Sequence, residues 1–254
     1  MTERTIDLNC DLGECDDAAG IANDLALLDI VTSANIACGG HAGDMRSMER
    51  TIVAAVERGV ALGAHPGYPD RANFGRVSCA MDHLQLASAI STQIETLLQI
   101  AVQCDGKITH VKPHGALYHA AMTQPDIAEL IADVVASLGL PAILVGQANS
   151  PALETWRRRG FRVAVEAFAD RRYEPDGTLR SRAKPDSIIE DPAQAAQQAV
   201  RIARGDGVIS VYSDVVALFA DTLCLHSDTP NAINNARAVR AALERVGVRC
   251  QALT

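Results

Sequence analysis

The chain has 254 residues, of which 48% are hydrophobic and 4% aromatic, and its 23 basic and 31 acidic side chains give a formal net charge of −8. Without a basic stripe, this charge argues against nucleic acid as a partner. The start of the chain lacks the apolar core of a secretory signal, and no run of about 18 apolar residues marks a membrane span. We therefore expect neither nucleic acid nor a membrane as a partner.

Strands and helices alternate along the chain. Patterns typical of strands cover residues 5–11, 33–38, 59–65, 108–112, 141–146, 161–168, 207–212 and 221–226, with a hairpin expected near residues 213–214. Helical periodicity covers residues 22–30, 46–59, 82–104, 126–138, 151–159, 193–204 and 231–246. This order predicts an α/β fold, with one domain over residues 1–254 and a parallel sheet of about seven principal strands covered by helices.

Cysteine usage indicates a reducing compartment. The seven cysteines are an odd number, form no CxxC pair and lie mostly in apolar runs. Disulfide frameworks belong to oxidising compartments and use paired cysteines. We therefore expect free thiols, most of them buried, and a cytoplasmic location.

The first strand carries a row of polar side chains on one face. Asp7, Asn9 and Asp11 alternate with apolar residues, and alternate residues of a strand share a face. Because parallel sheets are buried on both faces, this row must point into a barrel lumen or a crevice. Active sites of such folds lie at the carboxyl ends of the strands. Asp7, early in its strand, is expected to be structural or near the barrel floor.

Polar side chains recur at the ends of the later strands. They are Asn35, His41, Asp44, His65, Asp70, His110, Lys112, His114, Glu166, Asp170, Arg171, His226 and Asp228. Several have local explanations: Asp44 and Asp228 as helix caps, with capping favoured over chemistry for Asp228, and Asp70 as a turn residue. Together they predict a site at one end of the sheet.

Lys112 is the residue of this set that points most directly to a functional site. It is flanked by apolar residues on a strand that we expect to be buried, and lysine is almost never fully buried unless it is paired. Asp11, Glu166 and Asp170 are the candidate partners. A purely structural ion pair is the alternative interpretation.

The sequence is compatible with a metal site but lacks the motifs of nucleotide-binding and serine-hydrolase sites. His41 and His65 with Asp11 are reasonable ligands for a divalent ion, although the sequence does not fix its identity. The chain has no GxxxxGK[ST], GxGxxG, HExxH or GxSxG motif. It therefore shows no recognised nucleotide site of its own and no serine-hydrolase elbow.

Long segments of the chain resemble the LamB/YcsF family, in the same order and over nearly the full length. They are DLNCDLGE (7–14), TSANIACGGHAGD (32–44), GAHPGYPD (63–70) with FGR (74–76), HVKPHGALY (110–118), EAFADRRY (166–173) with DGTLRSR (176–182), and CLHSDTP (224–230). The chain departs from the family pattern at Cys15, where Gly is usual, at Ser227, where HGD is usual, and in the run after Glu14. If that run shapes the mouth of the site, substrate preference could differ.

The resemblance implies both a fold and an activity. The fold would be an irregular, seven-stranded (β/α) TIM-like barrel similar to the glycoside hydrolase/deacetylase superfamily. The activity would be that of the A subunit of prokaryotic 5-oxoprolinase, which cleaves 5-oxo-L-proline to L-glutamate with ATP hydrolysis. Subunits B and C would be the partners, and ATP would be handled with them or by them.

Residue roles follow from this activity as hypotheses. Asp11 or Glu166 would act as the general base for water. Lys112 and His114 would stabilise the oxyanion or the leaving phosphate. Arg171 would hold the substrate carboxylate. The remaining candidates are Asp170 in the catalytic cluster and Asn9, Asn35 and His226 at the substrate.

Two other functions stay open from the sequence. One is a stand-alone metal-dependent amidase or deacetylase that acts on an N-acyl substrate. The other is a non-catalytic subunit that binds the substrate while the chemistry occurs elsewhere. A bound metal and activity without partners would identify the first; binding that is weakened, without any other effect, by mutation of the base would identify the second.

Overall fold

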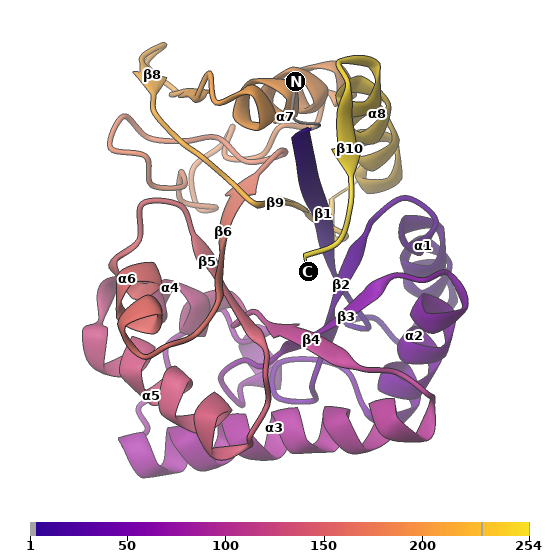
Figure 1. Ribbon diagram of the computed structural model, residues 1–254, viewed down its shortest axis with the longest axis vertical. Coiled ribbons are helices and arrows are strands. Elements are labelled where there is room, and N and C mark those ends of the chain that lie inside the picture. Colours follow the sequence, from indigo (N-terminus) through magenta and orange to yellow (C-terminus); the bar gives the residue numbers. More distant parts are fainter. Residues whose placement is uncertain (1–3, 230, 254) are drawn as a thin grey trace.

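The computed structural model describes residues 4–229 and 231–253. In this part of the chain, seven parallel strands close into a barrel because β9 returns to pair with β1, and helices surround it (Figure 1). The barrel strands are Arg4–Leu12 (β1), Ser33–Ala37 (β2), Ala61–His65 (β3), Ile108–Val111 (β4), Ile143–Gln147 (β5), Val163–Phe168 (β6) and Thr222–Leu225 (β9). The expected seven-stranded TIM-like barrel is confirmed.

The helices begin at residues that suit helix starts. Asp44 and Asp82 form capping boxes at α2 and α3, so the expected cap at Asp44 is confirmed. The helices are Ala18–Leu28 (α1), Met45–Glu57 (α2), His83–Gln103 (α3), Gly115–Thr123 (α4), Pro125–Ser137 (α5), Pro151–Arg158 (α6), Pro192–Arg204 (α7) and Ala232–Arg245 (α8), with a 3₁₀ turn at Arg71–Asn73 (η1). None of these helices of the described chain is long and apolar enough to cross a membrane.

Three elements differ from the sequence prediction. The strand expected at residues 207–212 is only Val208–Ile209 (β7), and it pairs with Val215–Val216 (β8) as the expected hairpin, outside the barrel. A short strand, Val248–Cys250 (β10), extends the sheet beside the start of β1. Helix α4 was not predicted, because a nine-residue helix that begins at a glycine gives too little periodic pattern.

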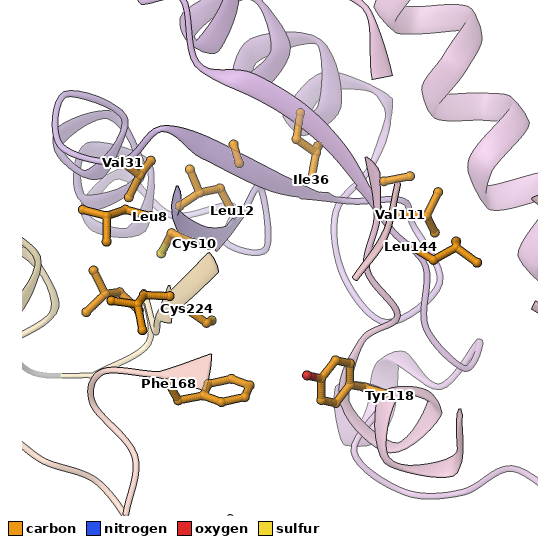
Figure 2. Packing of buried hydrophobic residues seen from close by; sticks show 14 of the residues in the cluster. Leu8, Cys10, Leu12, Val31, Ile36, Val111, Tyr118, Leu144, Phe168 and Cys224 are labelled. Atoms are coloured by element: carbon orange, nitrogen blue, oxygen red, sulfur yellow. The ribbon is translucent and has the colours of Figure 1, made fainter. Parts of the chain in front are cut away.

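The first strand separates an apolar layer from a polar lumen. Leu8, Cys10 and Leu12 belong to the apolar core that also holds Val31 and Ile36 (Figure 2). On the opposite face, Asp7 accepts hydrogen bonds from the hydroxyls of Thr32, Ser33 and Thr222. Asp7 is therefore a structural residue of the lumen, as expected.

Candidate active site

A cavity of about 460 Å³ opens at the carboxyl ends of the barrel strands. Its walls include Asp11 from β1, His65 from β3 and Phe168 from β6, each at or near the end of its strand. The segments that follow β4 and β9 contribute Lys112, His114 and His226. The sequence prediction of a site at this end of the barrel agrees with the position of the cavity.

Lys112 is buried against two carboxylates. Its Nζ lies 2.9 Å from Asp11 Oδ1 and 2.9 Å from Glu166 Oε1, and it donates to Asn9 Oδ1 at 3.2 Å. Burial would lower the pKa of Lys112, but Asp11 and the other nearby anions outweigh burial and hold it well above its usual range. Lys112 is therefore an ammonium whose three protons are already engaged.

Asp11 presents one oxygen to this network and the other toward the histidines. Oδ1 accepts from Lys112 Nζ and, at 2.8 Å, from Asn35 Nδ2, whereas Oδ2 lies 3.3 Å from His65 Nε2. Burial would raise the pKa of Asp11, but His65 and Lys112 outweigh it and hold the pKa well below its usual range. Asp11 consequently stays ionised at neutral pH.

Glu166 lies fully buried behind Lys112. Its carboxylate accepts from Tyr118 Oη at 2.8 Å and from Asn9 Nδ2 at 3.0 Å. Figure 2 shows the hydroxyl of Tyr118 pointing inward, on the side that faces Phe168. Asn9 and Asn35 are similarly buried and bonded to their neighbours. These groups hold Lys112 and Asp11 in place.

Four residues beside Asp11 bring their metal-binding atoms together. They are Glu14, His41, His65 and His114, and one ligand atom from each lies within 4.8 Å of the others. The sequence predicted a metal site from His41 and His65 with Asp11, but the cluster holds Glu14 and His114 in place of Asp11. Glu14 was not predicted as a site residue, and His114 was predicted only as a catalytic one. Gly13, at φ +76°, turns the chain directly after β1 and so brings Glu14 back over the barrel end.

Backbone carbonyls fix the protonation pattern of two of these histidines. His65 Nδ1 donates to the carbonyl of Lys112 at 2.7 Å, and His114 Nε2 donates to that of Phe74 at 2.9 Å. The remaining ring atoms, His65 Nε2 and His114 Nδ1, face each other at 3.0 Å. In neutral rings both of these atoms are acceptors, so their lone pairs require a proton or a cation between them.

The contacts of His41 also indicate a cation site. It stacks on His114 at a centroid distance of 3.6 Å, and its Nε2 lies 3.0 Å from Glu14 Oε1. Its buried Nδ1 has no hydrogen-bond partner in the described part of the chain. Gly75 permits this packing, since a Cβ there would lie 2.7 Å from the Cβ of His41. The residues present therefore fit a metal ion.

The charge states of two histidines suit the same conclusion, whereas Glu14 needs a nearby cation to be fully ionised at neutral pH. Burial, followed by the neighbouring His65, lowers the pKa of both His41 and His114 to about 2. Burial, followed by Asp11, raises the pKa of Glu14 to about 7. Metals bind neutral imidazole and ionised carboxylate. Three imidazoles with one carboxylate suit zinc or another transition metal better than magnesium or calcium.

Asp170 pairs with His226 instead of with Lys112. Its two oxygens accept from the backbone N and from Nδ1 of His226, each at 2.8 Å. Nδ1 of His226 therefore carries a proton, which leaves Nε2 free of this pair, and His226 lines the cavity. Arg171 also lines the cavity, but its guanidinium donates to the carbonyls of Ser187 and Arg180, so it organises the loop after β6.

Three charged residues from three different loops meet at the mouth of the cavity. Arg76 lies 2.6 Å and Arg182 lies 3.0 Å from the same oxygen, Oδ2 of Asp228. The expectation that Asp228 caps a helix is wrong, because Asn231 occupies the cap position of α8. From the sequence, Asp228 was considered as a strand-end residue, but Arg76 and Arg182 were not predicted as site residues.

Comparison with known proteins identifies the family. The sequence matches the LamB/YcsF family over residues 6–254. The chain belongs to the LamB/YcsF family. Among curated relatives, the protein of Methylococcus capsulatus that is named as the A subunit of 5-oxoprolinase is 46% identical, over 98% of this chain and 96% of the relative. The protein of the same name from Chloroflexus aggregans is 45% identical, over 96% of this chain and 97% of the relative.

Solved structures agree with this membership. A lactam utilization protein from Thermus thermophilus matches with a TM-score of 0.91 and 38% identity, and the match covers 98% of this chain and all of that one. A family 4 carbohydrate esterase from Streptomyces lividans matches with a TM-score of 0.51 and 11% identity, over 98% of this chain and 92% of that one. The second likeness concerns the barrel fold alone.

Proposed function

We propose that this chain is the A subunit of an ATP-dependent 5-oxoprolinase, a hydrolase that opens the cyclic amide of 5-oxo-L-proline to give L-glutamate. Relatives that carry this name match the chain over nearly its whole length. The observation that supports an active site here is the 460 Å³ cavity, which is lined by Asp11, Glu14, His65 and His114. His41 completes the histidine–glutamate cluster beside it. The cavity volume is in the range of small-molecule sites.

The proposed division of labour follows from the chemistry of the ring. A five-membered lactam is a relaxed, unreactive amide, and phosphorylation of its oxygen would make the ring carbon more electrophilic. The chain has no phosphate-loop motif. We therefore assign ATP to sites formed with or by subunits B and C, and the opening of the activated ring to this cavity.

Opening of the phosphorylated ring adds water to the carbon and breaks the bond to the ring nitrogen, which takes up a proton. The product of this step is the acyl phosphate of glutamate, and a second water releases its phosphate to give glutamate. Asp11 Oδ2 and the carboxylate of Glu14 are the anionic oxygens beside the histidine cluster that can orient water and accept its proton. Lys112 keeps Asp11 ionised and oriented. His226, held by Asp170 through Nδ1, would carry the proton for the nitrogen on Nε2.

The remaining residues have supporting roles in this proposal. Glu166, Asn9 and Asn35 act as positioning residues, because they are buried and hydrogen-bonded to Lys112, to Asp11 or to one another. Arg171 shapes the loop above the cavity. A metal held by Glu14, His41, His65 and His114 would act as a Lewis acid toward the substrate oxygen.

The test is formation of glutamate from 5-oxoproline. The chain is assayed alone, then with subunits B and C and ATP, with and without a chelator and with magnesium restored to support ATP. Turnover only in the full mixture is the expected result. If the chain alone hydrolyses a simple N-acyl substrate in a chelator-sensitive way, the histidine–glutamate cluster belongs to a metal-dependent amidase or deacetylase instead.

A further inference from the structure

At the mouth of the cavity, the positive charges of Arg76 and Arg182 exceed the single negative charge of Asp228. Arg76 comes from the loop between β3 and α3, Arg182 from the loop between β6 and α7, and Asp228 from the segment after β9. Two guanidiniums share one carboxylate, and both contact the same oxygen, Oδ2. The three side chains therefore keep one net positive charge at the entrance.

The two arginines also have unused donors. A guanidinium has five N–H groups arranged for binding to two-oxygen anions. The only contacts described between either arginine and Asp228 are single ones, and Arg76 also lies over the ring of Phe74, 4.8 Å from its centroid. This stacking fixes the plane of Arg76 while leaving its donors available. Both residues line the same cavity as Asp11 and Glu14.

We propose that Arg76 and Arg182 form a phosphoryl-binding subsite at the cavity mouth, which the carboxylate of Asp228 occupies in the free protein. The proposal rests on the proposed function, because a phosphorylated lactam would carry such a group into this cavity. A carboxylate on a ligand would bind weakly here, since it has the same charge as Asp228 and must compete with that side chain for the two arginines. A phosphoryl group has between one and two negative charges and three acceptor oxygens, so it can displace Asp228.

The test measures binding of inorganic phosphate by calorimetry to the full-length chain treated with chelator, so that a bound metal does not contribute. Acetate serves as the carboxylate probe and ATP as the nucleotide probe. We expect phosphate to bind more tightly than acetate. Arg76→Gln and Arg182→Gln should each weaken phosphate binding by about tenfold, which corresponds to the loss of one charge-assisted contact. Asp228→Asn should strengthen it.

Matched controls come from an ion pair on the outer surface. Arg159 contacts Asp133 there, and neither residue lines the cavity. Arg159→Gln and Asp133→Asn make the same charge changes and should leave phosphate binding unchanged. If the mouth variants change phosphate binding no more than these controls do, or if acetate binds as tightly as phosphate, the subsite does not exist.

The ATP arm distinguishes the source of the phosphoryl group. Binding of ATP that is much tighter than that of phosphate and is lost in Arg182→Gln would assign the subsite to the nucleotide, whereas equal binding assigns it to a phosphoryl group on the substrate. These measurements do not depend on turnover. A failure of the 5-oxoprolinase assignment would thus show in the glutamate assay, and a failure of the subsite would show in phosphate binding.

Discussion

Lys112 and Asp11 form a buried ion pair at the entrance to the barrel, with Lys112 Nζ 2.9 Å from Asp11 Oδ1. The same ammonium contacts Glu166 at 2.9 Å. One cation thus orients two carboxylates from different strands. This relationship connects the stability of the lumen with the chemistry of the cavity.

Replacing Lys112 by Met should destabilise the fold as well as stop turnover. It leaves Asp11 and Glu166 facing each other without a cation, and breaking such a buried pair costs about 3–5 kcal/mol. Urea unfolding measures this loss. Lys184→Met is the matched control, because Lys184 pairs with Glu174 at the surface and its replacement should destabilise the fold much less. Equal effects in the two variants would show that the Lys112 network is not structural.

Replacing Asp170 by Asn should lower kcat more than it changes KM. Asn can still accept a hydrogen bond from His226 but cannot stabilise its protonated ring, which the proton transfer to nitrogen requires. We expect a decrease in kcat of about 100-fold and an altered pH profile in the reconstituted enzyme. Asp176→Asn, at an exposed turn, serves as the control. An unchanged pH profile in Asp170→Asn would exclude the proposed role of His226.

Metal binding can be measured without any substrate. The chain should bind one transition-metal ion, and His114→Ala should lose it, because His114 Nδ1 faces His65 Nε2 inside the cluster. His83→Ala is the control, since His83 is exposed and pairs with Asp126. Metal analysis after dialysis gives the stoichiometry. Retention of the full metal content in His114→Ala would contradict the assignment of the cluster.

Asp24 should make stability depend on pH. Burial raises its pKa to about 6, although the N–H of Gly13 donates to its carboxylate. Because the folded pKa lies above the unfolded value, the folded form binds the proton more tightly, and ionisation opposes folding. Stability should therefore fall as the pH rises from about 4 to about 6. Asp24→Asn should remove this part of the pH dependence in thermal unfolding, and an identical pH dependence in both proteins would contradict it.

The sequence predicted the features that repeat at a fixed period or follow a strand. The polar row of Asp7, Asn9 and Asp11 was readable because strands alternate faces. The pairing of Lys112 with Asp11 and Glu166 was readable because a buried lysine needs carboxylates. The family segments identified the same barrel, which the structure confirms. Free cysteines were also expected, and all seven are free. The expectation that most of them are buried is wrong, because only Cys10, Cys38 and Cys224 are buried.

What the sequence missed depends on the paths of the loops. Glu14 reaches the histidines only because Gly13 adopts a positive φ after β1. Arg76, Arg182 and Asp228 meet from segments as far as 152 residues apart. Hydrogen bonds to backbone carbonyls hold His114 in the metal cluster, and no sequence pattern predicts such bonds. Asp170 accepts from the backbone N and Nδ1 of His226 because the segment after β9 brings His226 beside it. Cytoplasmic location and a single domain remain predictions.

The most direct test of the proposed function replaces one residue of this chain and measures the complete reaction. The Asp11→Asn variant of this chain is combined with unaltered subunits B and C, ATP and 5-oxo-L-proline, and glutamate formation is followed while size-exclusion chromatography checks assembly. We expect an intact complex that forms almost no glutamate, because the carboxylate beside the histidine cluster is lost. Full glutamate formation by that complex would show that the ring is opened elsewhere.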